Sequence, residues 1–552
     1  MKVNDKNKQT LQKLRGGYYT PIEIAEFLTT WAIEPDRYQK ILEPSAGDGV
    51  FIESLKGIDG NIDVTAVEIL EEEASKIVRK TEDFPNFKVE NIDFYDFYEE
   101  FRSQKLKGET EGYDVVLGNP PYIRYQYLTK EQRDFQSDIL ENNGVRSNKL
   151  INAWMAFTIA SVEMVKEEGK IAFILPTDLL QVSYAKQLRD FLFNSLSSLT
   201  IITFDELVFE GIQQDVVLLL GEKNILDLQR SRTHNLRIIN LENSSGLNND
   251  IFNVPFDQYT SYGSEKWTKF YLSREERIFY ELDFPKFMKS FNEFAKGEIG
   301  VTTGNNNFFV VNNSIVQSYD LQEYARPLLG RSIEVNGVFY EQKDLEKNIS
   351  ANQKVWMLDF NGKELSRNAQ NYIDYGIENG ENNGYKLSLR KRWFDIPSIW
   401  VPDAFMLRRI GEFPRIVKNE IQATSTDTFH RIKFREGINI SKFLFLMYSS
   451  PTLLTFELEG RIFGGGALEI LPGDLINVKI PIVDDLLNYD QLLKELDDKL
   501  RGNIPIVEIS SWVNEQIRQH TTFSENQLDN TFLMWRKLNE KRIAKGKNKT
   551  IS

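Results

Sequence analysis

The segment Tyr113–Tyr122, with the sequence YDVVLGNPPY, limits what this chain can fold into more than any other stretch. Its apolar β-forming residues run directly into Gly-Asn-Pro-Pro-Tyr, which predicts a buried strand that ends at Gly118. Pro120 and Pro121 have no N–H group to continue a β-ladder, and a residue before a proline is pushed out of the helical region. Asn119 is therefore predicted in a stiff, extended loop at the carboxyl end of a strand, where open α/β sheets bind ligands.

Two side chains of this loop suit a flat group that carries an amino group. The side-chain carbonyl of Asn119 can accept a hydrogen bond from NH₂, and the ring of Tyr122 can stack on another ring. The tetrapeptide Asn-Pro-Pro-Tyr resembles the catalytic motif of the amino-methyltransferases, which methylate exocyclic or amide nitrogen. For these four residues alone, a plain proline turn after a core strand is the alternative interpretation.

A glycine-containing strand–loop–helix pattern occurs earlier in the chain, at residues 40–51 (KILEPSAGDGVF). The strand is predicted to end at Leu42–Glu43 and the helix to start near Val50, with Gly47 and Gly49 in the loop between them. Glycines in such a loop let a ligand approach the backbone closely. The spacing differs from the dinucleotide pattern G-x-G-x-x-G. However, Glu-Pro-x-Ala-Gly-x-Gly-x-Phe closely resembles the S-adenosyl-L-methionine (AdoMet) loop of DNA amino-methyltransferases.

Acidic residues stand at the ends of the next two predicted strands, Asp63–Glu68 and Lys88–Phe94. Glu68 lies about 20 residues beyond the glycine loop, where an acidic side chain can accept both hydroxyls of a ribose. The family resemblance assigns Asp93 to the amino group of the cofactor's adenine and Phe94 to packing against its ring. Four successive strand ends thus carry the four motifs in order, which favours an AdoMet-dependent methyltransferase.

The turn Gly16–Pro21 predicts the start of a helix at Ile22–Ala32. Thr20 suits the N-cap, Pro21 the first helical position, and Glu23 the third residue of a capping box.

Taken together, these motifs resemble the γ-class DNA adenine-N6 methyltransferases of type II restriction–modification systems. The resemblance implies an α/β fold with a Rossmann-like AdoMet-dependent methyltransferase domain (a seven-stranded sheet), an α+β target-recognition domain and a helical C-terminal segment. These parts are expected at residues 1–265, 266–485 and 486–552. The residues implied to bind the cofactor are Tyr19, Thr20, Pro21, Glu43, Pro44, Ala46, Gly47, Gly49, Glu68, Asp93, Phe94 and Asn119.

The resemblance also implies that Asn119, Pro120, Pro121 and Tyr122 are catalytic. The target adenine is expected to be flipped out of the duplex and held between Tyr122 and Phe209, which precedes the second strand of a predicted hairpin. For Phe209, a place in the core of the hairpin is the alternative. The side-chain carbonyl of Asn119 and the backbone carbonyl of Pro120 are expected to accept the two N6 protons.

The absence of cysteine excludes several kinds of chemistry. Without a thiolate nucleophile the chain cannot methylate cytosine at C5, and it can form neither a disulfide nor a thiolate zinc site. Its three histidines, His234, His430 and His520, are far apart in the sequence, so no metal centre is expected.

The net charge of −14 argues mildly against a nucleic-acid partner, because phosphate contacts need lysine and arginine. A local basic face can override the net charge. The C-terminal half has basic residues interleaved with aromatic residues and glycine turns, a pattern that resembles a target-recognition domain. A solvated charged face is the alternative. The residues concerned are Arg326, Arg331, Arg390–Phe394, Arg408, Arg409, Lys433 and Arg461–Leu468.

The C-terminal tail is also basic, and two interpretations of it stay open. It either braces DNA or a partner helix, or it is a frayed, solubilising end. Its basic residues are Lys537, Lys541, Arg542, Lys545, Lys547 and Lys549.

The sequence thus predicts a site-specific, adenine-specific DNA methyltransferase that binds double-stranded DNA and protects it from a cognate restriction endonuclease. A cytoplasmic protein is expected, because no apolar run reaches the length of a membrane span and Met1–Arg15 does not resemble a signal peptide. The chain is also expected to be a monomer. Three alternatives remain: cytosine N4 as the target, a subunit that needs partner chains, and an RNA or protein-glutamine N-methyltransferase.

Overall fold

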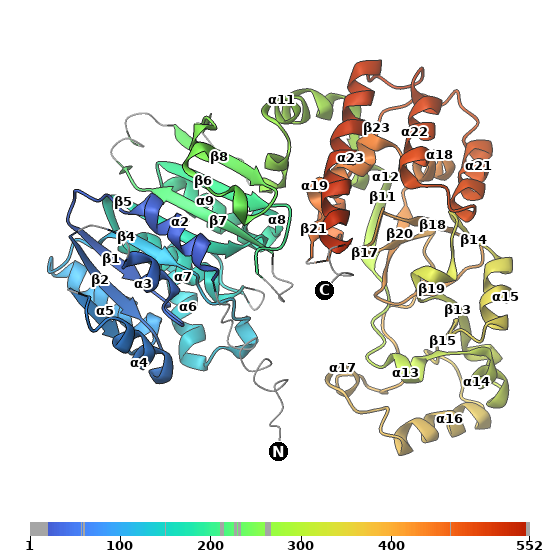
Figure 1. Cartoon of the computed structure of the whole chain (residues 1–552). Helices are drawn as coiled ribbons and strands as arrows, with labels where there is room; N and C mark the ends of the chain where they lie inside the picture. Colours follow the sequence, from blue (N-terminus) through green and yellow to red (C-terminus); the bar gives the residue numbers. More distant parts are fainter. Residues whose placement is uncertain are drawn as a thin grey trace. The chain divides into compact units, whose positions relative to one another are not determined.

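The computed structural model describes residues 20–56, 58, 61–84, 86–148, 151–209, 215–225, 229, 233–259, 266–463 and 465–547. By their internal contacts the residues form two compact units, Met1–Tyr271 and Leu272–Ser552 (Figure 1). Among the described helices, none has both the length and the apolar character that a membrane crossing requires.

The first unit is built on a nine-stranded sheet with the order β3-β2-β1-β4-β5-β7-β6-β8-β9. The strands from β3 to β5 are parallel, and β7 runs antiparallel to both of its neighbours. The seven strands expected from the sequence are the first seven in this order, and β8 and β9 extend the sheet. The strands are β1 (Gln39–Glu43), β2 (Ile62–Val67), β3 (Phe87–Glu90), β4 (Tyr113–Gly118), β5 (Val165–Pro176), β6 (Ser198–Phe204), β7 (Val216–Glu222), β8 (His234–Leu241) and β9 (Asp257–Tyr259).

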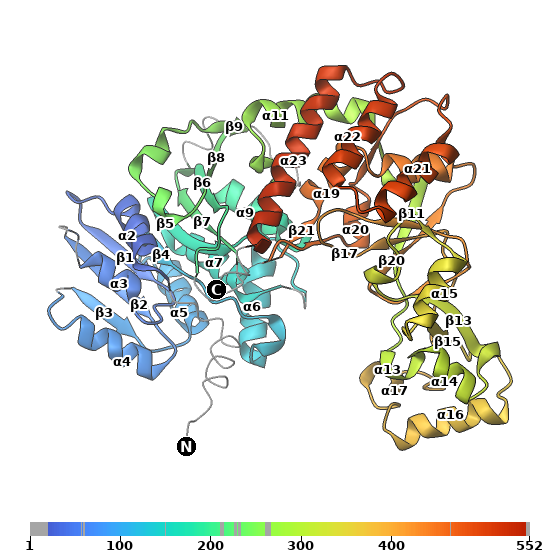
Figure 2. The ribbon, with the colours of Figure 1, turned by 45° about the vertical axis from the view of Figure 1, so that its right-hand side comes forward.

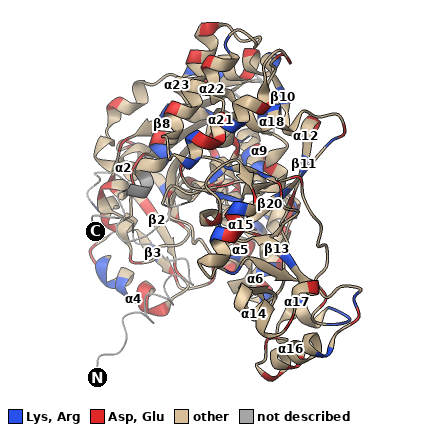
Figure 3. Cartoon of the chain, turned by 90° about the vertical axis from the view of Figure 1, so that its right-hand side faces the viewer, with Lys and Arg blue, Asp and Glu red and all other residues tan. Residues whose placement is uncertain are grey.

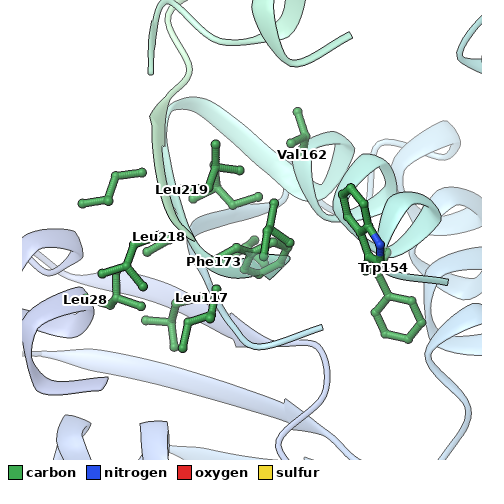
Figure 4. Packing of buried hydrophobic residues seen from close by; sticks show 14 of the residues in the cluster. Leu28, Leu117, Trp154, Val162, Phe173, Leu218 and Leu219 are labelled. Carbon is green, nitrogen blue, oxygen red and sulfur yellow. The ribbon is translucent and has the colours of Figure 1, made fainter. Parts of the chain in front are cut away.

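Helices cover both faces of this sheet, which explains the unbroken apolar runs of its central strands. Figure 4 shows Leu28 of α2 and Trp154 of α7 on opposite sides of strand residues such as Leu117 and Phe173, and all four are fully buried. The helices of this unit are α2 (Ile22–Ala32), α3 (Val50–Leu55), α4 (Glu71–Lys80), α5 (Phe94–Leu106), α6 (Lys130–Asn142), α7 (Ala153–Met164), α8 (Asp178–Gln181) and α9 (Lys186–Ser195).

The predicted start of α2 is confirmed, but its predicted cap is wrong. Pro21, with an extended backbone at φ −58° and ψ 138°, takes the N-cap position, and no side chain caps the helix. Thr20 is thereby moved outside the helix, and its hydroxyl accepts a hydrogen bond from the side-chain amide of Asn119 at 3.3 Å. Thr20 therefore contacts the Asn-Pro-Pro-Tyr loop and makes no cap.

The second unit contains four small sheets, with the orders β11-β20-β16-β18-β14, β12-β15-β13-β19, β17-β22-β21 and β10-β23. Its strands are β10 (Met288–Ser290), β11 (Ala295–Ile299), β12 (Val310–Val311), β13 (Ala325–Leu329), β14 (Phe339–Tyr340), β15 (Trp356–Leu358), β16 (Ala404–Leu407), β17 (Arg409–Ile410), β18 (Ile416–Asn419), β19 (Thr424–Ser425), β20 (Phe429–Phe434), β21 (Arg461–Ile462), β22 (Leu468–Glu469) and β23 (Lys479–Pro481).

Helices surround these sheets (Figure 2). The first begins after Ser273, as predicted, with a capping box between Ser273 and Glu276. The helices are α11 (Arg274–Ile278), α12 (Phe291–Phe294), α13 (Asn306–Phe309), α14 (Asn313–Ser318), α15 (Gln342–Ser350), α16 (Arg367–Glu378), α17 (Tyr385–Ser388), α18 (Ile440–Leu446), α19 (Ser450–Glu459), α20 (Pro472–Leu475), α21 (Tyr489–Arg501), α22 (Ile506–Ile517) and α23 (Glu525–Lys547).

Arg542 in α23 fits neither interpretation of the basic tail, because it is buried with only 1% of its surface exposed. Its guanidinium donates two hydrogen bonds to the carboxylate of Glu457 in α19, at 2.7 and 2.9 Å. It also donates to the backbone carbonyls of Gly411, Glu412 and Gly466. Arg542 therefore joins the last helix to the body of its unit.

Candidate active site

The four motifs predicted from successive strand ends line one cavity of about 800 Å³. They meet because β1 to β4 are parallel neighbours whose carboxyl ends lie at the same edge of the sheet. Of the residues implied to bind a cofactor, Pro21 and Gly49 do not line the cavity, and Tyr19 lies outside the described residues. Those that do are Thr20, Glu43, Pro44, Ala46, Gly47, Glu68, Asp93, Phe94 and Asn119.

The glycine loop after β1 is held by Glu68, the residue after β2. One carboxylate oxygen of Glu68 accepts a hydrogen bond from the Gly47 N–H and the other from the Leu70 N–H, both at 2.8 Å. Gly47 and Gly49 have φ values of +55° and +80°, which residues with a Cβ rarely adopt. Burial raises the pKa of Glu68, and the two N–H donors oppose this shift. The loop is thus fixed in a shape that leaves its backbone accessible to the cavity.

Glu43 gives the cavity an unusual electrostatic character. Its side chain is 1% exposed, and its Oε2 atom accepts no hydrogen bond from any described residue. Burial, together with the charges of Asp48 and Glu68, raises the pKa of Glu43 well above its usual value. A buried carboxyl group beside two other carboxyl groups suits a cationic ligand group, which would relieve their repulsion.

Asp93 lies at the end of β3 and caps α5. Its Oδ1 atom accepts a hydrogen bond from the Tyr95 N–H at 2.9 Å, and its Oδ2 atom accepts one from the side-chain amide of Gln132 at 2.7 Å. The ring of Phe94 stacks on Phe157 with a centroid distance of 4.1 Å. Flat apolar rings beside a carboxylate provide both the packing surface and the acceptor that an aromatic amine needs.

Sequence reasoning missed the wall of the cavity formed by residues 123–157. This wall contains Gln132 on α6 and Phe157 on α7. One signal was available: Thr129-x-x-Gln132 has the pattern of a capping box, and the structure contains that box. The pattern locates the start of α6, but it does not reveal that the Gln132 amide reaches Asp93.

Asn119 is fixed on both its side chain and its backbone. Its amide nitrogen donates to Thr20, and its backbone carbonyl accepts a hydrogen bond from the hydroxyl of Ser45 at 3.2 Å. With the nitrogen turned toward Thr20, the carbonyl oxygen lies on the other side of the amide group. The preceding residue, Gly118, has a φ of +154°. The loop therefore presents Asn119 in one defined orientation at the cavity.

Tyr122 and Phe209 do not line this cavity. Both are buried, with 8% and 3% of their surfaces exposed, and both belong to the core of the first unit. The hydroxyl of Tyr122 donates a hydrogen bond to the carbonyl of Ile174 near the end of β5, at 3.0 Å. Among the described residues, no three His, Asp or Glu side chains are arranged to hold a metal ion.

In the second unit, much of the basic set expected to contact DNA is engaged within the fold. Arg390 donates a hydrogen bond to the backbone carbonyl of Thr303 at 2.6 Å. The ion pairs are Arg326–Asp359, Arg392–Asp395, Arg408–Glu469, Arg409–Glu469 and Lys433–Asp403. Each of these side chains therefore already has a partner within the fold.

Two family models of type II restriction–modification methyltransferases match successive parts of the chain. The model of the Eco57I restriction–modification methylase matches residues 28–209, and that of the C-terminal domain of type II methyltransferase M.Eco57I matches residues 264–518. Type II methyltransferase M.HincII of Haemophilus influenzae is 29% identical over 241 residues, which cover 43% of this chain and 41% of M.HincII.

Two other similarities extend over most of the chain. Type II methyltransferase M.AccI of Acinetobacter calcoaceticus is 23% identical over 480 residues, which cover 83% of this chain and 84% of M.AccI. The solved structure of the type IIL restriction–modification enzyme MmeI in complex with DNA covers 98% of this chain and 75% of MmeI, with a TM-score of 0.52 and 11% identity, a likeness of fold alone. The two family models and the similarity to M.AccI show that the chain belongs to the type II restriction–modification methyltransferases.

Proposed function

We propose that this type II restriction–modification DNA methyltransferase transfers a methyl group from AdoMet to N6 of adenine in duplex DNA. The observation that carries the proposal is the single cavity in which the glycine loop, Glu68, Asp93 and Asn119 meet. Duplex DNA as the partner is supported by the likeness to MmeI, which was solved as a DNA complex. Target recognition is assigned to residues 266–485, and a cognate endonuclease acts on the same sites.

The cavity fits AdoMet in volume and in chemistry. About 800 Å³ is within the range of sites that enclose small molecules. Asp93 and Phe94 receive the adenine, Glu68 the ribose, and Glu43 the positively charged amino group of the methionine part. When bound, AdoMet supplies an electrophilic methyl group on its sulfonium.

Asn119 and Pro120 prepare the target nitrogen. In free adenine the N6 lone pair is delocalised into the ring, so N6 is a poor nucleophile. The Asn119 side-chain carbonyl and the Pro120 backbone carbonyl accept hydrogen bonds from the two N6–H groups in a geometry that favours a pyramidal NH₂ group. These contacts are stronger in the transition state than in the ground state, and they therefore accelerate the reaction.

In this proposal the flipped base stacks between Tyr122 and Phe209, and both side chains must turn out of the core in which they are buried to receive it. The bond from the Tyr122 hydroxyl to the Ile174 carbonyl anchors the outer end of the tyrosine ring, which reduces the entropy lost on stacking. Position 119 is occupied by asparagine rather than serine. This choice favours N6 of adenine over N4 of cytosine as the methylated atom.

We expect Glu43→Gln to stabilise the cofactor-free chain at pH 8 while weakening AdoMet binding. Because the pKa of Glu43 is raised in the folded state, the folded chain loses stability as the pH rises from the usual carboxyl pKa toward the raised value. A neutral side chain removes that cost but also removes the partner of the ligand's amino group. Thermal unfolding at pH 5 and pH 8 and calorimetric titration with AdoMet measure both effects.

The stability gain of Glu43→Gln should be larger at pH 8 than at pH 5, where Glu43 of the unchanged chain holds its proton. The exposed Glu23→Gln serves as the matched control and should change neither quantity. An AdoMet Kd for Glu43→Gln equal to that of the unchanged chain contradicts the assigned role.

Gln132→Glu should weaken AdoMet binding about tenfold or more at pH 8, and the loss should shrink at pH 5. The new carboxylate keeps the capping box with Thr129 but puts a negative charge within hydrogen-bonding distance of Asp93. Two carboxylates this close share a proton at lower pH, which relieves the repulsion. The exposed Gln126→Glu adds the same charge nearby and should leave the Kd unchanged. If the change in Kd is the same at pH 5 and pH 8, repulsion between Asp93 and the new carboxylate is not its cause.

The substrate class is tested by offering methyl-labelled AdoMet and the purified single chain with duplex DNA, RNA or protein in parallel. We expect label in duplex DNA alone. Label in RNA or protein overturns the proposed substrate. If DNA is labelled only after a partner chain is added, the single-chain activity proposed here is wrong.

A further inference from the structure

The segment around α17 exposes two large apolar side chains next to each other. Tyr385 is 80% exposed and Leu389 is 69% exposed. They are four residues apart with helical backbone between them, so they lie on the same face of one turn. Single exposed apolar residues are common on protein surfaces, but adjacent ones are typical of contact sites.

This segment is not a loose loop, because its inward-facing residues are firmly held. Leu387 is 1% exposed and packs closely against Gly304, where an added Cβ would lie 2.9 Å from the leucine. The Arg390 guanidinium donates hydrogen bonds to the carbonyls of Thr303 at 2.6 Å and Trp393 at 3.2 Å. Figures 1 and 2 both show α17 beside α13. Tyr385 and Leu389 are therefore displayed on a fixed support, which reduces the entropy lost on binding.

The segment that carries this apolar pair is rich in basic residues. Residues 383–394 contain four lysines and arginines and no acidic residue, and Figure 3 colours basic positions in the loop beside α17. Lys386 and Lys391 are both exposed, and neither forms an ion pair with any described residue. Arg392, by contrast, is neutralised by Asp395 through two hydrogen bonds of 2.8 Å. The two lysines are thus the cations that this segment offers to a partner.

We propose that Tyr385 and Leu389 contact the bases of duplex DNA in a groove while Lys386 and Lys391 bind the flanking phosphates. This inference rests on the proposed function and assigns part of its DNA contact surface. Apolar side chains contact thymine methyl groups or enter base steps, and lysines supply the salt-dependent part of the affinity. A protein partner explains the apolar pair equally well, but two unpaired lysines in a chain of net charge −14 favour a polyanion.

The test is a fluorescence-anisotropy titration of the full chain with a labelled mixed-sequence duplex at several salt concentrations. The double variant Lys386→Gln/Lys391→Gln should lower the slope of log Kd against log salt by about two, close to one per phosphate contact. The double variant Tyr385→Ala/Leu389→Ala should weaken binding about tenfold, a typical size for a lost base contact, and leave the slope unchanged.

Matched controls are available in the same unit. Lys347→Gln/Lys494→Gln removes two exposed lysines elsewhere, and Ile333→Ala/Leu486→Ala removes two side chains that are 75% and 82% exposed. Both should bind DNA as the unchanged chain does. Because all eight side chains are exposed, the variants should unfold at the same temperature, and a common midpoint confirms that each is folded.

The outcomes separate this inference from the proposed function. If the unchanged chain binds DNA and both segment variants bind with the same Kd and salt slope, the inference is wrong while the proposed function stands, and the apolar pair is left to a protein partner. If the unchanged chain binds no DNA, the proposed function itself fails and the inference fails with it.

Discussion

Replacing Asn119 by alanine lowers the rate of methyl transfer by about a hundred- to a thousandfold, the usual cost of losing one preorganised group that stabilises a transition state. The side-chain carbonyl is the acceptor proposed for one N6–H group, and alanine has no group to replace it. AdoMet binding should change little, because the contacts assigned to the amino group, the ribose and the adenine of AdoMet lie on Glu43, Glu68 and Asp93. The measurement is a single-turnover rate with labelled AdoMet, together with the AdoMet Kd.

The matched control for this prediction is Asn143→Ala, which removes a side-chain amide at the end of α6 that donates a hydrogen bond to the carbonyl of Ile139. It should leave the rate unchanged. A rate for Asn119→Ala within a few-fold of the unchanged chain removes Asn119 from the chemistry. A large loss of AdoMet binding, with the rate restored at saturating AdoMet, instead makes Asn119 a cofactor-binding residue.

Arg542→Met should destabilise the second unit by about 3–5 kcal/mol, the range measured when one partner of a buried ion pair is removed. The side chains of Arg542 and Glu457 are 0% and 3% exposed, so water cannot replace the lost contact. In the variant, the Asn539 amide at 2.9 Å is the one hydrogen-bond donor that the described residues still offer to the buried Glu457 carboxylate. Three backbone carbonyls also lose their guanidinium donor. Methionine fills a similar volume, so the loss reports the charge and the hydrogen bonds.

Arg536→Met on the same helix is the control for this effect. Arg536 pairs with Glu540 across one helical turn, but both side chains are half-exposed, so the pair should contribute about 0–1 kcal/mol. Chemical denaturation followed by tryptophan fluorescence compares the free energies of unfolding. Equal stabilities for the two variants contradict the structural role assigned to Arg542.

The edge of the first sheet could be predicted because its signals are local. One run of apolar β-forming residues stops at Gly118, and another stops at the glycine loop. Each stop can be recognised in the sequence as the end of a strand. Parallel pairing then brings successive strand ends together without any further information. Glu68, Asp93 and Asn119 meet at one cavity for this reason.

The parts that sequence reasoning missed depend on contacts between distant segments. The position of Gln132 beside Asp93 follows from how α6 packs against the end of β3, which no local pattern encodes. Thr20 was assigned to a cap because threonine before proline suits one, yet its hydroxyl bonds Asn119, which is 99 residues away. The tertiary contact with Asn119 thus outweighs the local preference of Thr20 for the N-cap position.

Arg542 illustrates a signal that was present but outweighed. Lysines around it suggested a solvated tail, whereas the buried Trp535, Leu538 and Asn539 recur at helical spacing and lie on the face that also carries Arg542. The partner Glu457 is 85 residues away, so periodicity indicates a buried face without identifying what neutralises the charge. The same limit applies to Arg408 and Arg409, whose partner is the distant Glu469.

The most direct test of the central claim is the identity of the methylated atom. The purified chain is incubated with methyl-labelled AdoMet and mixed-sequence duplex DNA, and the DNA is then digested to nucleosides and separated. We expect the label in N6-methyldeoxyadenosine. Label in N4-methyldeoxycytidine, or DNA that stays unlabelled while the chain binds AdoMet, contradicts it.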